Sequence, residues 1–378
     1  MASFDFQYPA DSIGATSAAG VYFNNLSKEN EAKLGEVMAW AGANTVDLVK
    51  VNKHALLPEL TVLRFLRANK FDVKKTQKAI TGHLAWQDEI KLSEIVQRKP
   101  EEILTCEIGA FTDLYPHWHY GYDKTGRPVM YKQYDRFLAG AIKRLTGDSF
   151  DNVMTYHIWE QEAAAELCKR QSVKHRAIIE TITGVIDIKD MKMAQITRNF
   201  LALVKLMAEV DQKRYPETLG KIFIINAPSA FGGVWKMVKG WVDPVTRDRI
   251  QVLKGPEEYE PLLKDFIGIE NLPANYGGNL PPLCEHMHPY SEYLTGVAPC
   301  VSASASASAS RTNSNSNAEN LTAVDQSERS LTATPVRDLG DNSGDSPPDT
   351  GDQPVGLIDA DAAADAVAQL DMSDSGAS

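Results

Sequence analysis

The sequence predicts an α/β domain with a largely parallel sheet, preceded by a small all-helical lobe. From about residue 128 onwards, short apolar runs alternate with amphipathic helical stretches. This alternation is typical of parallel strands joined by helical crossovers. Residues 27–105, in contrast, carry helical patterns only. The chain has 378 residues, which is enough for one large or two medium-sized domains.

Three helices are predicted in the N-terminal lobe. Ser27 is a good N-cap residue and precedes the first helix, which Gly42 and Asn44 end. The second helix begins at Pro58, because proline is well placed in the first turn of a helix, and it ends near Lys70. Asp72 then caps a third helix that runs to about Trp86, while residues 91–120 are expected to be irregular with short helical pieces.

The α/β part predicts its elements in a regular order. A strand is expected from Val129 to Gln133, a helix from about Phe150 to Lys169, and a strand from Gly184 to Ile188. A long helix follows from Met193 to Lys213. The last two elements are a short strand, Arg249 to Leu253, and a helix from Glu257 to Phe266.

The chain is organised around residues 221–246. Ile222 to Ile225 is a short β-branched run that predicts a buried strand, and Pro228 ends it. A helical pattern follows, whose apolar side chains fall on one stripe: Phe231, Val234, Trp235, Val238, Trp241 and Val242. Asp243 and Pro244 then begin a new element.

This helical stretch allows two interpretations. Gly232, Gly233 and Gly240 interrupt it, and each glycine costs about 1 kcal/mol of helix stability relative to alanine. Lys239 lies at the edge of the apolar stripe and Lys236 lies further round. The first interpretation is a core helix after a core strand. The second is a movable apolar lid whose basic edge holds an anion.

Short motifs frame this stretch on both sides. Tyr215–Leu219 precedes the strand, Ile225–Pro228 follows it, and Asp243–Thr246 lies beyond the helix. Together with Leu63–Val73 in the helical lobe, they resemble the CRAL-TRIO lipid-binding family, and most closely its secretory-type phosphatidylinositol transfer proteins. The resemblance implies the CRAL-TRIO fold with a mobile gate helix, and it places the lipid-binding domain at residues 106–283.

The resemblance also implies a function. It predicts a cytosolic protein that binds phosphatidylinositol and exchanges it between membranes, with transient membrane contact and without covalent chemistry or a cofactor. The apolar stripe would line the lipid cavity or meet the bilayer, where the amphipathic tryptophan ring is favoured. A monomer is expected.

The family's head-group site can be carried over residue by residue. Lys239 matches the lysine of the gate helix, and Lys70 matches the second basic position. Asn69 stands where close relatives carry an arginine. The acidic partner of the gate lysine falls at Leu206, and Glu209, about one turn later, is our candidate to replace it.

The identity of a second ligand is left open. The family's phosphatidylcholine-contacting hydroxyls fall at Ile182 and Gly184, which have none, and Thr181 and Thr183 are out of register. We therefore expect a second, unidentified apolar ligand or phospholipid.

The formal charge of −11 is unevenly distributed. Thirteen acidic and three basic residues lie in 301–378, and the remainder of the chain is nearly neutral, which gives nucleic-acid binding no electrostatic support. Residues 300–378 are predicted to be a disordered acidic tail, and residues 1–26 a flexible N-terminus. The tail motivates an alternative function, a lipid-sensing adaptor that recruits a protein partner.

Other chemistry finds little support in the sequence. The four cysteines are scattered, as in reduced cytosolic proteins: Cys106, Cys168, Cys284 and Cys300. Cys284, His286 and His288 are metal-compatible residue types, but three ligands in one loop are usually incidental, so no metal site is expected. His117 and His119 are expected to pack in a loop. No enzyme motif, signal pattern or membrane-length apolar run is present.

Overall fold

The protein is described here by a computed structural model that covers residues 26–229, 231–242, 244–283 and 289–290. A five-stranded sheet has its strands in sequence order, β1-β2-β3-β4-β5. The strands are β1 (His117–Tyr122), β2 (Pro128–Gln133), β3 (Ile182–Asp187), β4 (Leu219–Ile225) and β5 (Ile250–Val252). The first pair is antiparallel and the other three pairs are parallel, which confirms the predicted, largely parallel sheet.

The helices before the sheet form the N-terminal lobe and a connecting segment. They are α2 (Lys28–Ala43), α3 (Leu48–Val51), α4 (Pro58–Ala68), α5 (Val73–Glu89), α6 (Leu92–Ile95), α7 (Pro100–Leu104) and α8 (Ile108–Leu114). The predicted caps are confirmed, because Ser27 accepts a hydrogen bond from the Asn30 amide and Asp72 accepts one from the Lys75 amide. α2, α4 and α5 share an apolar core that includes Val37, Leu66 and Ile80.

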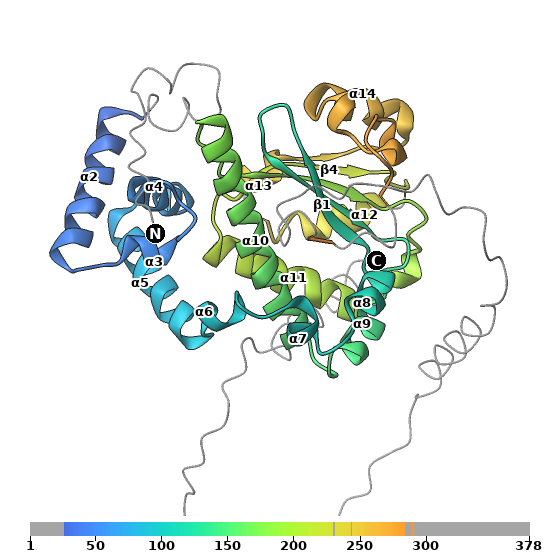
Figure 1. Ribbon diagram of the computed structural model, residues 1–378, viewed down its shortest axis with the longest axis horizontal. Coiled ribbons are helices and arrows are strands. Elements are labelled where there is room, and N and C mark those ends of the chain that lie inside the picture. Colours follow the sequence, from blue (N-terminus) through green and yellow to red (C-terminus); the bar gives the residue numbers. More distant parts are fainter. Residues whose placement is uncertain (1–25, 230, 243, 284–288, 291–378) are drawn as a thin grey trace, which may run out of the picture. The chain divides into compact units, whose positions relative to one another are not determined.

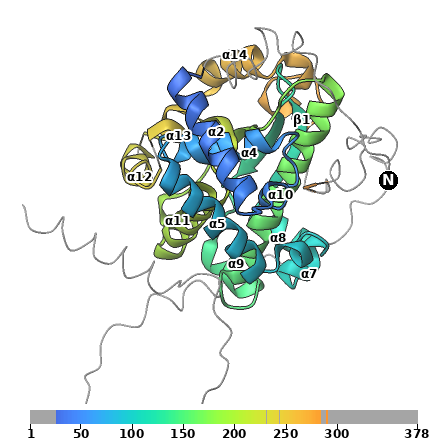
Figure 2. The same ribbon diagram turned by 90° about the vertical axis from the view of Figure 1, so that its left-hand side faces the viewer.

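Helices also make the crossovers between parallel strands and follow the last strand. They are α9 (Ala139–Leu145), α10 (Asp151–His175), α11 (Arg198–Arg214), α12 (Phe231–Val238), α13 (Pro244–Asp248) and α14 (Pro256–Phe266), with 3₁₀ turns at Met193–Gln195, Ile269–Asn271 and Ala274–Tyr276. Figure 1 shows α14 on one side of the sheet and α10 and α11 on the other. Figure 2 shows α12 and α13 beside α11.

Alternation along the strands explains this three-layer arrangement, because successive side chains point to opposite faces of a sheet. Val129, Val185 and Phe223 pack with Tyr259 and other residues on the α14 side. Their neighbours in sequence point to the opposite face, which α10, α11 and α12 cover: Met130, Gly184, Ile186, Ile222 and Ile224. β3 and β4 lie between these two layers and contain apolar stretches, Val185–Ile186 and Ile222–Ile225, which is why both strands could be predicted.

One strand was not predicted, and several predicted boundaries differ from those in the structure. β1 lies within the segment that was expected to be irregular. It was not predicted because it consists of histidine, aromatic and glycine residues and contains no aliphatic run. α10 continues past Lys169 to His175. The helix expected to start at Met193 begins at Arg198 instead, since the Thr197 side chain caps it and a 3₁₀ turn precedes it.

The segment after the last 3₁₀ turn returns to the sheet. The Pro289 carbonyl accepts a hydrogen bond from the His119 amide on β1 at 2.9 Å. The ring of Tyr290 is fully buried, lies perpendicular to the Trp159 ring at 4.9 Å between centroids, and its hydroxyl donates to Glu160. Tyr290 therefore belongs to the folded domain, beyond the predicted end at residue 283. The predicted flexible N-terminus (apart from Leu26) and the acidic tail lie outside the described residues.

We expect Tyr290→Ala to lower the free energy of unfolding by about 3–5 kcal/mol, as for other large core aromatics. Tyr290→Phe keeps the ring and removes only the hydroxyl, so its cost should be about 1–3 kcal/mol. Urea unfolding of both variants checks this. Unfolding of Tyr290→Ala at the wild-type midpoint would show that the ring does not stabilise the domain.

Candidate functional site

The link between β4 and α12 is held in place at Asn226. Asn226 directly follows β4 and has a φ of +57°, which turns the chain sharply. Its side-chain amide donates to Asp187 Oδ1, at the end of β3, at 2.8 Å. Burial raises the pKa of Asp187, although the hydrogen bond from Asn226 opposes this shift. The ends of the two central strands are thus tied together at the start of the gate segment, residues 226–249.

The apolar stripe of α12 faces the sheet. Val234 is buried, and Phe231 and Trp235 pack against a cluster that contains Ile224 and Ala227. Gly232 and Gly233 are exposed, and a Cβ added to either would meet no neighbouring atom. α12 therefore packs its apolar stripe on the sheet in this structure and leaves its glycines and Lys236 on the exposed side.

The gate helix is shorter than its sequence pattern predicts. It ends at Val238, and tight turns follow, in which the Gly240 and Trp241 amides donate to Met237 and Val238. Trp241 still packs against the large core of α9, α10 and α11. Its carbonyl accepts a hydrogen bond from Gln212 of α11 at 2.9 Å. Val242 is half-buried, while Asp243, predicted to begin the next element, lies outside the described residues.

The segment beyond the gate is anchored to the turn before β4. Glu217, with a φ of +59°, accepts a hydrogen bond from Arg249 Nη2 at 2.6 Å. Arg249 also donates to the Leu219 carbonyl. The neighbouring Pro216 carbonyl accepts from Arg64 of α4 at 3.0 Å. This turn therefore joins the gate segment, the sheet and the N-terminal lobe.

The four residues predicted to bind the lipid head group lie apart from one another in the interactions of this structure. Lys239 is half-buried and Lys70 is exposed, and neither side chain has a hydrogen bond or ion pair to the described part of the chain. Asn69 is the C-cap of α4, and its side-chain amide donates to the Phe65 carbonyl. Glu209 is half-buried on α11. None of the described interactions joins these four side chains to one another.

Two residues that the sequence comparison considered for ligand contacts, Leu206 and Thr183, have structural roles instead. Leu206 is 2% exposed and belongs to the main core, so the acidic position has become an apolar one. Thr183 is fully buried, and its hydroxyl donates to Asp123 Oδ2 at 2.8 Å. That hydroxyl therefore points away from the gate side of the sheet, where Ile182 and Gly184 lie.

A buried cluster of charges lies between α10, β1, β2 and α11, and the sequence did not predict it. Glu160 is its centre, with Lys132 Nζ and His157 Nδ1 at 3.6 and 3.5 Å from Oε2. Burial alone would raise the pKa of Glu160, but the surrounding cations hold it well below its usual range. His117, expected in a loop, lies on β1 at 3.5 Å from Glu160 Oε1. The members of this cluster lie on separate elements, so no local sequence pattern indicated that they would meet.

His157 connects this cluster to α11. Its Nε2 lies 2.8 Å from Asp211 Oδ1. Burial would lower its pKa, but Asp211 and Glu160 together raise it to about 9. The histidine is therefore positively charged at neutral pH.

A histidine also holds the N-terminal lobe against α10. The two ring nitrogens of His54 each lie 3.1 Å from a carboxylate oxygen, of Glu166 and of Glu162. Ionised carboxylates only accept hydrogen bonds, so both contacts require the imidazolium form. Burial would lower the pKa of His54, but these two hydrogen bonds raise it.

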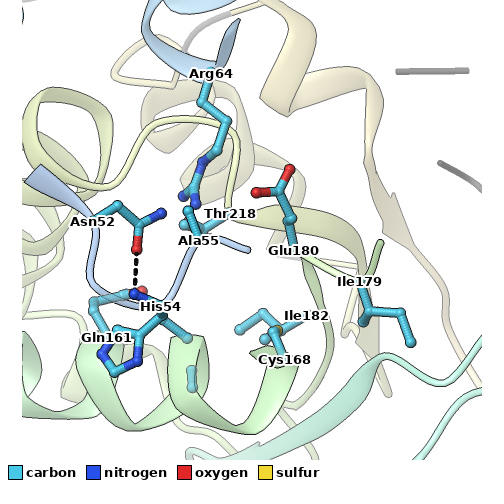
Figure 3. A pocket seen from close by; sticks show the side chains of 12 residues that line it. Asn52, His54, Ala55, Arg64, Gln161, Cys168, Ile179, Glu180, Ile182 and Thr218 are labelled. Carbon is cyan, nitrogen blue, oxygen red and sulfur yellow. Dashed lines mark hydrogen bonds between the residues drawn. The ribbon is translucent and has the colours of Figure 1, made fainter. Parts of the chain in front are cut away.

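A cavity of about 20 Å³ lies beside His54, between the lobe and the sheet domain. Figure 3 shows the Arg64 guanidinium and the Glu180 carboxylate at the same end of it. Both Glu180 oxygens are buried without a hydrogen-bond partner among the described residues, and burial raises the pKa of this carboxyl. The cavity has room for one water molecule but not for a lipid.

Neither a metal site nor a membrane-spanning helix is present among the described residues. They contain no group of three histidine, cysteine or acidic side chains placed to hold a metal ion. Cys284, His286 and His288 lie outside them, whereas His119 packs against Tyr290. None of the described helices combines the length and the apolar character needed to cross a bilayer.

Comparison with known proteins identifies both lobes. Residues 114–278 match the CRAL/TRIO domain, and residues 31–82 match the CRAL/TRIO N-terminal domain. A crystal structure of Sfh5 matches with a TM-score of 0.51 at 17% identity and covers 71% of this chain and 96% of its own, which supports the fold.

Sequence relatives carry names that describe lipid transfer. The phosphatidylinositol/phosphatidylcholine transfer proteins SFH12 and SFH11 of Arabidopsis thaliana are 33% and 30% identical over 59% and 67% of this chain. These matches span 41% and 66% of the two relatives' own lengths. The CRAL-TRIO domain-containing protein YKL091C of Saccharomyces cerevisiae is 30% identical over 67% of this chain and 79% of its own.

The His157 cluster predicts a pH-dependent stability. Because its folded pKa of about 9 exceeds the ordinary value of 6.5, its contribution is complete below pH 6.5 and is lost as the pH rises through 9. A shift of this size corresponds to roughly 3 kcal/mol. Urea unfolding of the wild type and of His157→Gln across this range should show the stability difference shrinking. A constant difference would mean that His157 is neutral when folded.

Proposed function

Because the chain belongs to the CRAL-TRIO family, we propose that it binds a phospholipid between α12 and the sheet and exchanges phosphatidylinositol between membranes. The observation that carries this proposal is the gate segment itself. An apolar stripe closes over an apolar sheet face, and the segment is tied to the sheet before and after it. The names of the Arabidopsis relatives, which describe transfer of phosphatidylinositol and phosphatidylcholine, support the same class of ligand.

Acyl chains would replace the contacts that α12 makes now. Ile222, Ile224 and Val252 present aliphatic side chains on the face that Phe231 and Trp235 cover. Each acyl methylene moved from water to such a surface contributes about 0.8 kcal/mol, so two chains can be held by burial alone. Entry of a lipid then requires α12 to swing away, with its exposed glycines easing that motion. No bond is made or broken, so the activity is transfer and not catalysis.

The head group needs positive charge. A phosphodiester taken out of water is costly unless a cation or hydrogen-bond donor compensates it. Lys239, at the end of the gate, and Lys70, at the turn between α4 and α5, are the cations that we assign to it. We add Glu209 and Asn69 to the proposed head-group site. The side-chain NH₂ of Asn69 also keeps its hydrogen bond to the end of α4.

The second ligand is inferred from two positions that lack a hydroxyl, and the cellular location from the names of relatives. Since Ile182 and Gly184 supply no hydroxyl, we propose a second apolar ligand or phospholipid whose head group is not bound there. Relatives from Yarrowia lipolytica and Eremothecium gossypii are named cytosolic factors. We propose a cytosolic monomer that meets membranes transiently. Mass spectrometry of co-purified lipids identifies the second ligand.

Lys70→Ala combined with Lys239→Ala should abolish transfer of labelled phosphatidylinositol between vesicles, because charge-assisted contacts are each worth about 1.5–3 kcal/mol. Thermal stability should be preserved, since both side chains lack partners in the described structure. The matched control is Lys74→Ala with Lys236→Ala, two exposed lysines on α5 and on the gate helix. Equal transfer by both double variants would remove Lys70 and Lys239 from the head-group site.

Replacing Trp235 and Trp241 by alanine should weaken association with vesicles and slow transfer. Both rings are only partly buried, so they are available to a bilayer or a lipid once α12 moves. The control, phenylalanine at both positions, keeps an apolar ring and should retain most activity. Flotation with vesicles and circular dichroism are the measurements. If the alanine variant unfolds, the rings serve packing, because tryptophan in a core contributes about 3–5 kcal/mol.

A further inference from the structure

A groove of about 480 Å³ lies at the edge of the sheet opposite the gate. It is formed by the turn between β1 and β2, the last turns of α10, and residues 177–181, which lead into β3. The gate follows the carboxyl end of β4, whereas this groove adjoins the amino ends of β2 and β3. The two sites are therefore separated by the length of the strands.

The turn that forms one wall is held rigidly. Asp123 is 3% exposed, and its Oδ1 accepts hydrogen bonds from the Thr125 amide at 2.8 Å and the Arg127 amide at 3.0 Å. Its other oxygen accepts from Thr183 of β3 at 2.8 Å. The carboxylate thus fixes the backbone on both sides of the turn, and the positions of Lys124 and Arg127 with it, before any ligand arrives.

The turn also packs closely on the other wall. Gly126 has a φ of +83°, and a Cβ added there would lie 2.9 Å from the Ile179 side chain and 3.2 Å from the His175 ring. Only glycine permits this approach. The width of the groove is therefore determined by the packing of the turn on the end of α10.

The accessible charge in the groove is positive. Lys124 and Lys174 line it with exposed side chains, whereas Arg127 is largely buried and pairs with Asp123 Oδ2 at 3.7 Å. The two acids are turned away from solvent, since Asp123 is committed to the turn and the Glu180 oxygens are buried. The Lys174 ammonium lies 5.9 Å from the centre of the Tyr122 ring. Lys124 lies 3.6 Å from Asp265, but both side chains are exposed, so this pair is weak.

We propose that this groove binds a phosphomonoester, carried either by a soluble inositol phosphate or by a lipid head group. Cations from two separate walls suit a compact anion with several acceptor oxygens. The volume lies in the usual range for small-molecule sites, roughly 300–1,000 Å³.

This site is independent of the proposed lipid transfer. Lys124 and Lys174 lie beside the amino ends of β2 and β3, whereas α12 follows the carboxyl end of β4, so a phosphorylated ligand can occupy the groove whether the gate is open or closed. Such a site would let a phosphorylated molecule or membrane hold the protein while the gate exchanges its lipid.

Calorimetric titration of the full chain with inositol 1,4,5-trisphosphate tests the proposal. Lys124→Gln combined with Lys174→Gln should weaken binding at least tenfold, and the wild-type affinity should fall with added salt. Lys28→Gln with Lys213→Gln, two exposed lysines elsewhere, is the charge-matched control and should bind as the wild type does. Thermal unfolding verifies that each variant is folded. The alanine variant of Lys70 and Lys239 should also bind normally, which separates this groove from the proposed head-group site.

A parallel arm uses vesicles of phosphatidylcholine with and without phosphatidylinositol 4-phosphate. Binding of the soluble ligand, lost in the Lys124 and Lys174 variant alone, supports the site for a free phosphate. Co-sedimentation with the phosphorylated vesicles only, lost in the same variant, supports it for a lipid head group. Absence of binding in both arms, or equal binding by this variant and the control, overturns the proposal.

Discussion

The burial of one carboxylate, Glu160, constrains the centre of the sheet domain. A buried charge is stable only when it is paired, and removing one partner of such a pair typically costs about 3–5 kcal/mol. The partners of Glu160 come from four separate segments: Lys132 of β2, His117 of β1, His157 of α10 itself, and Tyr290 from beyond the last 3₁₀ turn. Satisfying this charge therefore fixes the first crossover and the C-terminal segment against each other.

The lipid exchange that we propose requires the gate segment to move within the same domain. Asn226 is held by Asp187 at the start of the gate segment, and Arg249 by Glu217 at its end. Between these anchors, α12 contacts the sheet by apolar side chains, which can exchange one apolar neighbour for another at little cost. A directional bond at each end with an adaptable surface between them restricts motion to the gate while the strands keep their register.

Sequence reasoning recovered what depends on local pattern and missed what depends on distant partners. β4 and the stripe on α12 are apolar runs with a recognisable period, so both were predicted, although Gly240 and its turns end the helix at Val238. β1 was missed because His117 and His119 are polar residue types, and the partners that make the burial of His117 favourable, Tyr156 and Glu160, lie about 40 residues later in the chain. The ion pair of Lys132 was not predicted either, because its partner Glu160 is also distant in the sequence. The gate residues and lysines could be chosen by resemblance, but their ligand contacts remain predictions.

Leu206 shows why a charged position cannot be transferred from a family pattern by spacing alone. It belongs to the apolar face of α11, where an unpaired carboxylate would be buried at high cost. Glu209 lies three residues further on, and Gln212 three more, so the two are neighbours on the helix surface. Gln212 contacts the carbonyl of Trp241, two residues after Lys239. Glu209 thus occupies the side of α11 that faces the end of the gate, and this position supports our proposal that Glu209, in place of an acid at position 206, is the acidic partner of Lys239.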